Sequence, residues 1–280
     1  NGGGAFLVAY LLFIILFGYV ALSAEYAIGR RAKTGTVGSY ALAWRTRKKE
    51  LARAGRILGF LPLAGSMCIA IGYACIISYV LKGFTAAITG TIMTVDTGAW
   101  FESFSLVNYS IVPFHIVIVV VSLASLLLGA ESIEKTNKVM MPLFFIIFLI
   151  LAVRVAFLPG AAEGYTYMFT PRWADLLNPM VWIWAMGQAF FSLSITGSGM
   201  IVYGAYLHPE ENVVSLAKQT ALFDTIAALV AALVIIPACF AYQLDVGAGP
   251  SLLFVTLPRI LQDIPLGRLF AVILYTAMVF

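Results

Sequence analysis

The chain has 280 residues, of which 62% are hydrophobic and 11% are charged, and its mean hydropathy is +0.98. Soluble domains are only about 45 to 50% apolar, so this composition excludes a soluble fold and predicts an all-α polytopic membrane protein surrounded by a lipid bilayer. The formal net charge of +4 comes mostly from one loop. A nucleic-acid partner is therefore not expected.

Six apolar runs are long enough to cross a bilayer, because a spanning helix needs about 20 predominantly apolar residues. They cover residues 5–28, 57–81, 109–128, 139–158, 181–207 and 215–242. A seventh run, at 269–280, is too short to span. The sequence opens on Asn1 rather than Met and stops inside that run. This predicts a fragment of a longer protein, with residues 1–280 forming a single transmembrane domain.

Lys and Arg predict how the chain is oriented, because they accumulate in cytoplasmic loops. Nine of the seventeen basic residues lie between Arg30 and Arg56, which predicts that this loop, 30–56, is cytoplasmic. The following loops alternate, so we expect the Asn1 end outside a plasma membrane that the chain crosses several times. Segment 244–265 holds an apolar stretch too short to cross, and we expect it to form a lid hairpin on the extracellular face.

The fifth run is interrupted near its middle by hydroxyls and glycines, in the sequence SLSITGSG at 192–199. Backbone groups released from a helix at membrane depth cost several kcal/mol each unless they line a polar cavity or bind something. Broken helices of this kind form ion and solute sites in transporters, so the pattern predicts a transporter. No catalytic constellation of Ser, His and Asp converges at one depth, and we do not expect an enzyme.

Five short motifs occur in the order and approximate spacing of one known family. They are NGGGAF at 1–6, EYAIGR at 25–30, KVMMP at 138–142, GQAFFSLS at 187–194 and FVTLP at 254–258. In these motifs the chain resembles the neurotransmitter:sodium symporters, particularly their bacterial amino-acid branch. The resemblance implies an inverted-repeat sodium symporter fold with one broken transmembrane helix. It is incomplete at both ends, running from the loop after the family's first helix to the first half of its eighth.

The resemblance also implies two ligands of a co-transported sodium ion, Ser192 and Asp224. Both are hard oxygen donors suited to a small cation. A carboxylate at the centre of a span costs about 2.5 to 3.5 kcal/mol to insert, so an acid there usually faces a cavity or a cation. The alternative for Asp224 is a hydrogen bond to a neighbouring helix.

Some members of that family balance the sodium charge with chloride, at positions that correspond here to Tyr10, Gln188, Ser192 and Asp224. Asp224 places a fixed negative charge where relatives often carry a neutral Asn. A carboxylate beside an anion is repulsive by a few kcal/mol at the effective dielectric constant of a protein. We therefore expect chloride-independent transport, with the Asp224 carboxylate supplying the negative charge.

The resemblance implies a substrate site for an amino acid, lined by Ile69, Tyr73, Phe191, Ser192, Ser194 and Gly197. Ile69 and Tyr73 lie four residues apart and hence on one helical face. Gly197 stands where relatives frequently have a bulky residue, which enlarges the pocket and favours a hydrophobic or aromatic amino acid. Thr196 replaces the usual glycine, which leaves the local backbone open. Simple packing is the alternative for Tyr73 and Phe191.

Two further positions are implied in bracing and gating. Glu25 would brace the unwound part of the family's first helix, and Tyr206 would support the cytoplasmic gate. The alternative for Glu25 is snorkelling of its side chain towards the cytoplasmic interface.

The function expected from these observations is sodium-coupled symport of an amino acid by alternating access. One alternative is a proton-coupled amino-acid or amine transporter of the same fold, with Asp224 or Glu25 carrying the proton. Another is a transport-dead, receptor-like membrane protein. Uptake driven by a pH gradient without sodium would favour the first, and unchanged stability on adding sodium and amino acid would favour the second.

Overall fold

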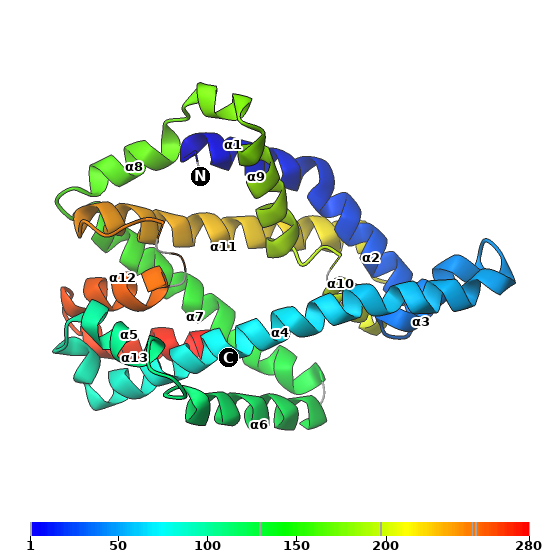
Figure 1. Cartoon of the computed structure of the whole chain (residues 1–280), viewed down its shortest axis with the longest axis horizontal. Helices are drawn as coiled ribbons and strands as arrows, with labels where there is room; N and C mark the ends of the chain where they lie inside the picture. The colour runs from blue at the N-terminus through cyan, green and yellow to red at the C-terminus, as the bar shows by residue number, and fades with distance from the viewer. Residues whose placement is uncertain (1, 129, 197, 248, 250, 280) are drawn as a thin grey trace. The chain divides into compact units, whose positions relative to one another are not determined.

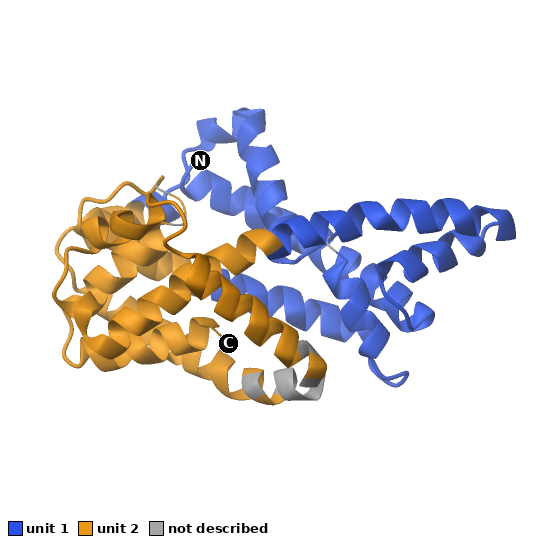
Figure 2. Ribbon diagram, turned by 60° about the horizontal axis from the view of Figure 1, so that its bottom comes forward, with its two compact units in different colours: residues 1–70, 167–228 blue, residues 71–166, 229–280 orange. Residues whose placement is uncertain are grey.

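The protein is described from a computed structural model, which covers residues 2–128, 130–196, 198–247, 249 and 251–279. These residues form helices joined by turns (Figure 1). They divide into two compact units, which we call unit 1 (residues 1–70 and 167–228) and unit 2 (residues 71–166 and 229–280; Figure 2). The single transmembrane domain expected from the sequence stays a prediction.

The helices are distributed over the two units, and three of them contribute to both. Unit 1 contains α1 (Gly4–Phe13), the π-helix η1 (Ile14–Gly18), α2 (Tyr19–Ala32), α3 (Thr36–Arg45), η2 (Lys49–Leu51), η4 (Trp173–Leu177), α9 (Pro179–Ser192) and α10 (Gly199–Tyr206). Unit 2 contains η3 (Thr91–Met93), α5 (Thr97–Ser105), α6 (Val112–Leu128), α7 (Ala130–Ala156), α12 (Ser251–Gln262) and α13 (Gly267–Val279). The shared helices are α4 (Ala52–Thr89), α8 (Ala161–Phe169) and α11 (Val213–Ala241).

Most of the predicted spans are present as long helices. Among the described residues, four helical stretches are long and apolar enough to cross a membrane, at Gly4–Ala32, Lys49–Thr89, Asn137–Ala156 and Val213–Ala241. Helix α6 occupies the third predicted run but is shorter, and the run at 181–207 is divided between α9 and α10. The all-α polytopic membrane fold with one broken helix, expected from the sequence, is thereby confirmed.

In unit 1, both halves of the broken helix pack along one continuous rod made of α1, η1 and α2. Helix α9 lies against α1 and α10 lies against α2 (Figure 1). The α2–α10 contact is close because both helices present a glycine. A Cβ atom on Gly204 would lie 2.6 Å from the Tyr26 carbonyl oxygen, and one on Gly29 would meet the Ile201 carbonyl. Small residues of this kind let membrane helices approach through their backbones.

The starts of α9 and α11 are fixed by side-chain caps. Asn178 Oδ1 accepts a hydrogen bond from the Met180 amide at 3.0 Å, and Pro179 occupies the first helical position. Asn212 Oδ1 accepts a hydrogen bond from the Ser215 amide at 3.0 Å. Asn is a favoured cap residue, and Pro suits the first helical position because no amide is needed there. These caps set the register of Ser192 and Asp224 along their helices.

Unit 2 is built around an apolar core with an aromatic cluster. The rings of Phe101 on α5 and Phe254 on α12 stack with centroids 5.3 Å apart, and Tyr79 packs edge-on against both. Such pairs stabilise beyond their buried area. Gln262 then ties the end of α12 to the chain around η3, donating to the carbonyls of Ile92 at 2.7 Å and Val95 at 2.9 Å. The described residues of segment 244–265 contain one helix, α12, and the extracellular lid hairpin remains a prediction.

Candidate functional site

The helix break is the centre of the candidate site. Helix α9 ends at Ser192 and α10 begins at Gly199, so the glycine- and hydroxyl-rich stretch interrupts the helix as predicted. Ser194, Thr196 and Ser198 adopt left-handed backbone conformations with φ of 53°, 65° and 68°. This region is sparsely populated by residues other than glycine, and a β-branched residue such as Thr is a particular outlier there. The break therefore stores backbone strain.

Ser192 and Asp224 meet beside this break. The Ser192 hydroxyl donates a hydrogen bond to Asp224 Oδ2 at 2.6 Å, which joins the last residue of α9 to the middle of α11. Both side chains are half-buried. The donor and acceptor distance is that of a strong hydrogen bond to a charged oxygen. The structure thus brings together the two predicted sodium ligands, and the contact also matches the helix-to-helix hydrogen bond that was the alternative for Asp224.

Tyr10 on α1 adds a third polar group to this pair. Its hydroxyl lies near Ser192, Asp224 and Thr225. The Tyr10 hydroxyl is buried and makes no hydrogen bond to any residue that the structure describes. Buried polar atoms nearly always have partners, and the neighbouring hydroxyls of Ser192 and Thr225 are the candidate partners for the Tyr10 hydroxyl. Thr225 was not singled out from the sequence.

Glu25 on α2 contacts the break itself. Its Oε1 accepts a hydrogen bond from the Thr196 amide at 2.6 Å, whereas its Oε2 is buried and has no partner among the described residues. The Glu25 carboxylate therefore holds one of the backbone groups that the broken helix releases. The hydroxyl of Ser198 is likewise buried without a described partner. The sequence did not predict the hydrogen bond between Glu25 and the Thr196 amide or the burial of the Ser198 hydroxyl. Both depend on the local path of the backbone.

The positions proposed for substrate contact are more dispersed. Phe191 and Ser194 are exposed at the break in unit 1, and Gly197 lies outside the described residues. Ile69 and Tyr73 are exposed on successive turns of α4, at the point where that helix passes from unit 1 to unit 2. A shared substrate site that includes Tyr73 stays a prediction.

The charge-balance and gating positions also lie on the predicted elements. Gln188 is exposed on α9, one turn before Ser192, and Tyr206 is exposed as the last residue of α10. Their predicted roles are not tested by these positions. Among the described residues, no group of three or more His, Cys, Asp or Glu side chains gathers as a metal centre, so a cation at the break would rely on hydroxyl and carbonyl oxygens together with Asp224.

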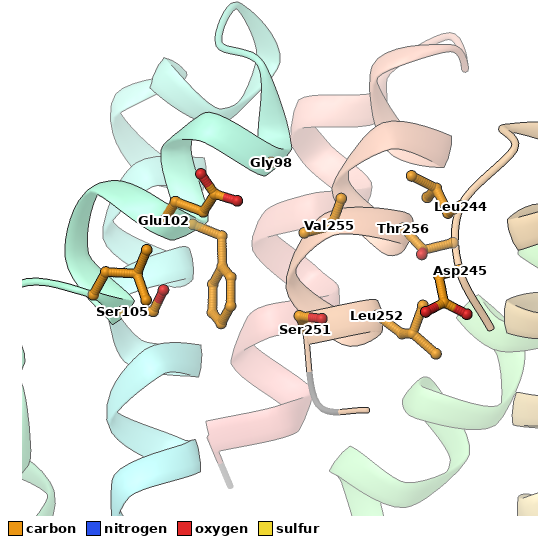
Figure 3. A pocket seen from close by; sticks show the side chains of 11 residues that line it. Gly98, Glu102, Ser105, Leu244, Asp245, Ser251, Leu252, Val255 and Thr256 are labelled. Carbon is orange, nitrogen blue, oxygen red and sulfur yellow. The ribbon is translucent and has the colours of Figure 1, made fainter. Parts of the chain in front are cut away.

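A separate cavity of about 360 Å³ lies in unit 2, between α5 and α12 (Figure 3). Its walls are largely apolar, with the Glu102 and Asp245 carboxylates on opposite sides. The hydroxyls of Ser105, Ser251 and Thr256 also line it. None of the sequence-predicted site residues lines this cavity.

Comparisons with known proteins agree with this geometry. The model of the sodium:neurotransmitter symporter family matches residues 89–280. The sodium-dependent transporter YhdH of Bacillus subtilis is 32% identical over the whole chain, which covers 61% of that protein. The sodium-dependent neutral amino acid transporter B(0)AT3 of Mus musculus is 28% identical over 84% of the chain, which corresponds to 42% of that protein.

A solved structure extends the likeness to three dimensions. The crystal structure of MhsT in complex with L-phenylalanine superposes with a TM-score of 0.91 at 32% identity, covering all of this chain and 63% of that one. The chain therefore spans about three fifths of the length of YhdH and of MhsT.

A multi-pass helical fold with a broken helix is the architecture of a large class of membrane transporters. The family match and the relatives make the assignment specific. The chain belongs to the sodium:neurotransmitter symporter family.

Proposed function

We propose that this chain forms the part of a sodium-coupled amino-acid symporter that carries one sodium site, with Ser192 and Asp224 as ligands. The observation that carries the proposal is the 2.6 Å hydrogen bond from Ser192 Oγ to Asp224 Oδ2 beside the helix break. Each of the two groups supplies a hard oxygen, and the surrounding backbone offers carbonyls that the helix no longer uses. The names of the relatives as sodium-dependent transporters support sodium as the coupling ion.

The geometry suggests how sodium and solute are coupled. The Ser192 hydroxyl gives its only proton to Asp224, which leaves its lone pairs to face a cation. A half-buried carboxylate is destabilising without a counter-charge. A bound sodium ion would therefore stabilise the arrangement in which Ser192 on α9 contacts Asp224 on α11. The solute then binds to a completed site, and each ligand raises the affinity of the other, typically by about 5- to 150-fold.

A hydrophobic or aromatic amino acid is the proposed solute. The support is the likeness to MhsT, whose structure was solved with L-phenylalanine. Phe191 and Ser194 at the break would contact the solute, together with the predicted positions Ile69, Tyr73 and Gly197. Glu25, which accepts a hydrogen bond from the Thr196 amide, would brace this broken helix in addition to the unwound first helix of the full protein, and Tyr206 would support the cytoplasmic gate.

Transport is proposed to be independent of chloride. Asp224 already places a negative charge beside Ser192, at the position where an anion would otherwise balance sodium. A chloride ion near Tyr10, Gln188 and Ser192 would be repelled by this carboxylate.

The test uses the full-length transporter in proteoliposomes, with uptake of labelled L-phenylalanine driven by an inward sodium gradient. Uptake is expected to need sodium and to persist when gluconate replaces chloride. Asp224→Ala is expected to abolish sodium-driven uptake, whereas Glu163→Ala, which removes an exposed carboxylate from α8, serves as the matched control.

Three outcomes would contradict the proposal in different ways. Uptake driven by a pH gradient without sodium would favour proton coupling. Failure of sodium and L-phenylalanine to raise the unfolding temperature would favour a transport-dead, receptor-like protein. Collapse of sodium-driven uptake without chloride would remove the chloride-independent mechanism alone.

A further inference from the structure

The basic loop after α2 is folded as a close-packed helical pair, which we call the basic hairpin (residues 33–59). Helix α3 packs against the start of α4 through two glycines spaced four residues apart. A Cβ atom on Gly55 would lie 2.6 Å from the Tyr40 carbonyl oxygen, and one on Gly59 would lie 2.9 Å from Val37 Cα. Glycines at this spacing let two helix backbones touch. The hairpin is therefore a defined platform for the charges that it carries.

Two cations at the base of this platform have internal partners. Arg30 Nη1 donates to the Glu211 carbonyl at 2.6 Å, and Lys33 Nζ donates to the Leu207 carbonyl at 2.7 Å. The Leu207 carbonyl follows the last residue of α10, and the Glu211 carbonyl lies in the turn that precedes α11. These two residues hold the end of α2 against the end of α10.

The remaining cations of this region are different. Their side chains form no hydrogen bond or ion pair with any residue that the structure describes. These residues are Arg31, Arg45, Arg47, Lys48, Lys49, Arg53 and Arg56. The only acid between residues 30 and 56 is Glu50, so the hairpin carries a large unbalanced positive charge. Residues 43–50, which form its tip, are all exposed. The charges repel one another unless anions are supplied from outside the chain.

The lengths of the adjoining helices predict that the basic hairpin lies at the depth of lipid headgroups. It joins two stretches long enough to span the bilayer, Gly4–Ala32 and Lys49–Thr89. Helix α4 has 38 residues and is therefore about 57 Å long, against about 30 Å for the hydrocarbon core. Its uninterrupted apolar run starts at Ile57, so its first turns extend into the headgroup region. Trp44, which is 38% exposed beside the tip cations, is a side chain typical of that interface.

We propose that the basic hairpin binds the headgroups of anionic phospholipids, with Arg45, Arg47, Lys48 and Lys49 at its tip as the phosphate-binding residues. A guanidinium pairs with a phosphate through two parallel hydrogen bonds, and a lysine ammonium adds a point charge. Trp44 lies at the interface beside them. This surface uses none of the residues of the helix break, so it stands or falls independently of the transport function.

The test measures lipid binding to the purified full-length transporter in detergent. Phosphatidylglycerol and phosphatidylcholine of the same chain length are titrated separately, and bound lipid is counted by native mass spectrometry. Each basic residue near an anionic surface contributes about fivefold in affinity. The variant R45Q/R47Q/K48Q/K49Q is therefore expected to bind phosphatidylglycerol at least tenfold more weakly, on the order of a few hundredfold if the four contributions add, with phosphatidylcholine binding unchanged.

The controls separate charge from structure. R45K/R47K keeps the charge and is expected to retain most of the phosphatidylglycerol preference. The quadruple variant keeps Arg30, Arg31, Lys33, Arg53 and Arg56 and hence the same orientation signal, and its unfolding temperature without lipid checks that it is folded.

Equal binding of the two lipids by the unchanged protein, or undiminished phosphatidylglycerol binding by the quadruple variant, would overturn the proposal. Displacement of the lipid by glycerol phosphate at similar concentration would also overturn it, because the site would then recognise a soluble phosphate. Weakening of phosphatidylglycerol binding by salt supports it, since exposed charges are screened.

Discussion

The two units of the molecule differ in how many polar groups they bury without a hydrogen-bond partner among the described residues. Unit 1 buries the Tyr10 hydroxyl, one Glu25 oxygen and the Ser198 hydroxyl without described partners, all close to the helix break. Unit 2 fills its interior with aromatic and aliphatic side chains, and Tyr275 is its one comparable side chain among the described residues. Buried polar atoms without partners are destabilising and rare. Their concentration in unit 1 agrees with the proposal that the binding site lies in this unit.

The largest expected effect tests the charge at the break. Asp224→Asn keeps the shape of the side chain but removes the negative charge beside Ser192. We expect uptake in chloride-free medium to fall by at least about tenfold, because the sodium charge is no longer balanced, and we expect chloride to restore it. Glu163→Gln, which neutralises an exposed acid on α8, is the control. Chloride-independent uptake by the Asp224→Asn variant would remove the charge-balance argument.

The next effect tests the close contact between α2 and α10. A methyl group at Gly29 or Gly204 would meet a backbone carbonyl of the other helix, so Gly29→Ala and Gly204→Ala are each expected to destabilise unit 1 by about 1 to 3 kcal/mol. Gly187→Ala on α9 and Gly72→Ala on α4 have no atom within 4 Å of the new methyl group and are expected to be neutral or slightly stabilising. Unfolding in detergent with added denaturant provides the comparison, and equal effects at all four sites would refute the close-contact explanation.

A smaller effect, of opposite sign, tests the strain at the break. Thr196 has φ of 65° while its amide donates to Glu25. Thr196→Gly keeps the amide and removes the steric penalty of the left-handed conformation, so we expect stabilisation by about 1 kcal/mol. Leu193→Gly, at a residue of the break with negative φ, is expected to destabilise because it deletes a buried side chain. An unfolding midpoint for Thr196→Gly below that of the unchanged protein would show that the left-handed conformation of Thr196 does not destabilise the folded state.

The smallest effect concerns the hydrogen bond between Tyr242 and Asp263 in unit 2. Tyr242, which follows the last residue of α11, donates its hydroxyl proton to Asp263 Oδ2 at 2.6 Å. Burial, and then the hydrogen bond to Asp263, raise the pKa of the Tyr242 phenol above its ordinary value. The resulting stabilisation is complete below about pH 10 and is lost as the pH rises further and the phenol ionises in the folded protein.

Tyr242→Phe removes this dependence on pH. We expect it to lower stability at pH 8 by at most about 1 kcal/mol, because Asp263 is exposed, and to flatten the loss of unfolding temperature above about pH 10. Parallel alkaline profiles for the variant and the unchanged protein would exclude Tyr242 as the responsible group.

Some of these features could be predicted from the sequence and others could not. The interruption of the fifth apolar run was readable because hydroxyls and glycines stand where a lipid-facing helix should be most apolar, and the pairing of Ser192 with Asp224 followed from the family resemblance. The π-helix η1 was not readable, since IILFG at 14–18 is as apolar as its neighbours. Hydrophobic periodicity is weak where both lipid and protein interior are apolar. The contact between Glu25 and the Thr196 amide depends on backbone path and left no signal in residue types.

The π-helix η1 determines which way the side chains of α2 face. A π-bulge adds one residue to an α-helix, and each residue turns the helix by about 100°. Tyr10 precedes the bulge and Glu25 follows it, yet both contact the broken helix or its surroundings. Excising one residue between Ile14 and Gly18 would restore uniform winding and swing Glu25 and Gly29 about a quarter of a revolution out of alignment. The extra residue in η1 thus rotates α2 relative to α1, so that α1 faces α9 while α2 faces α10.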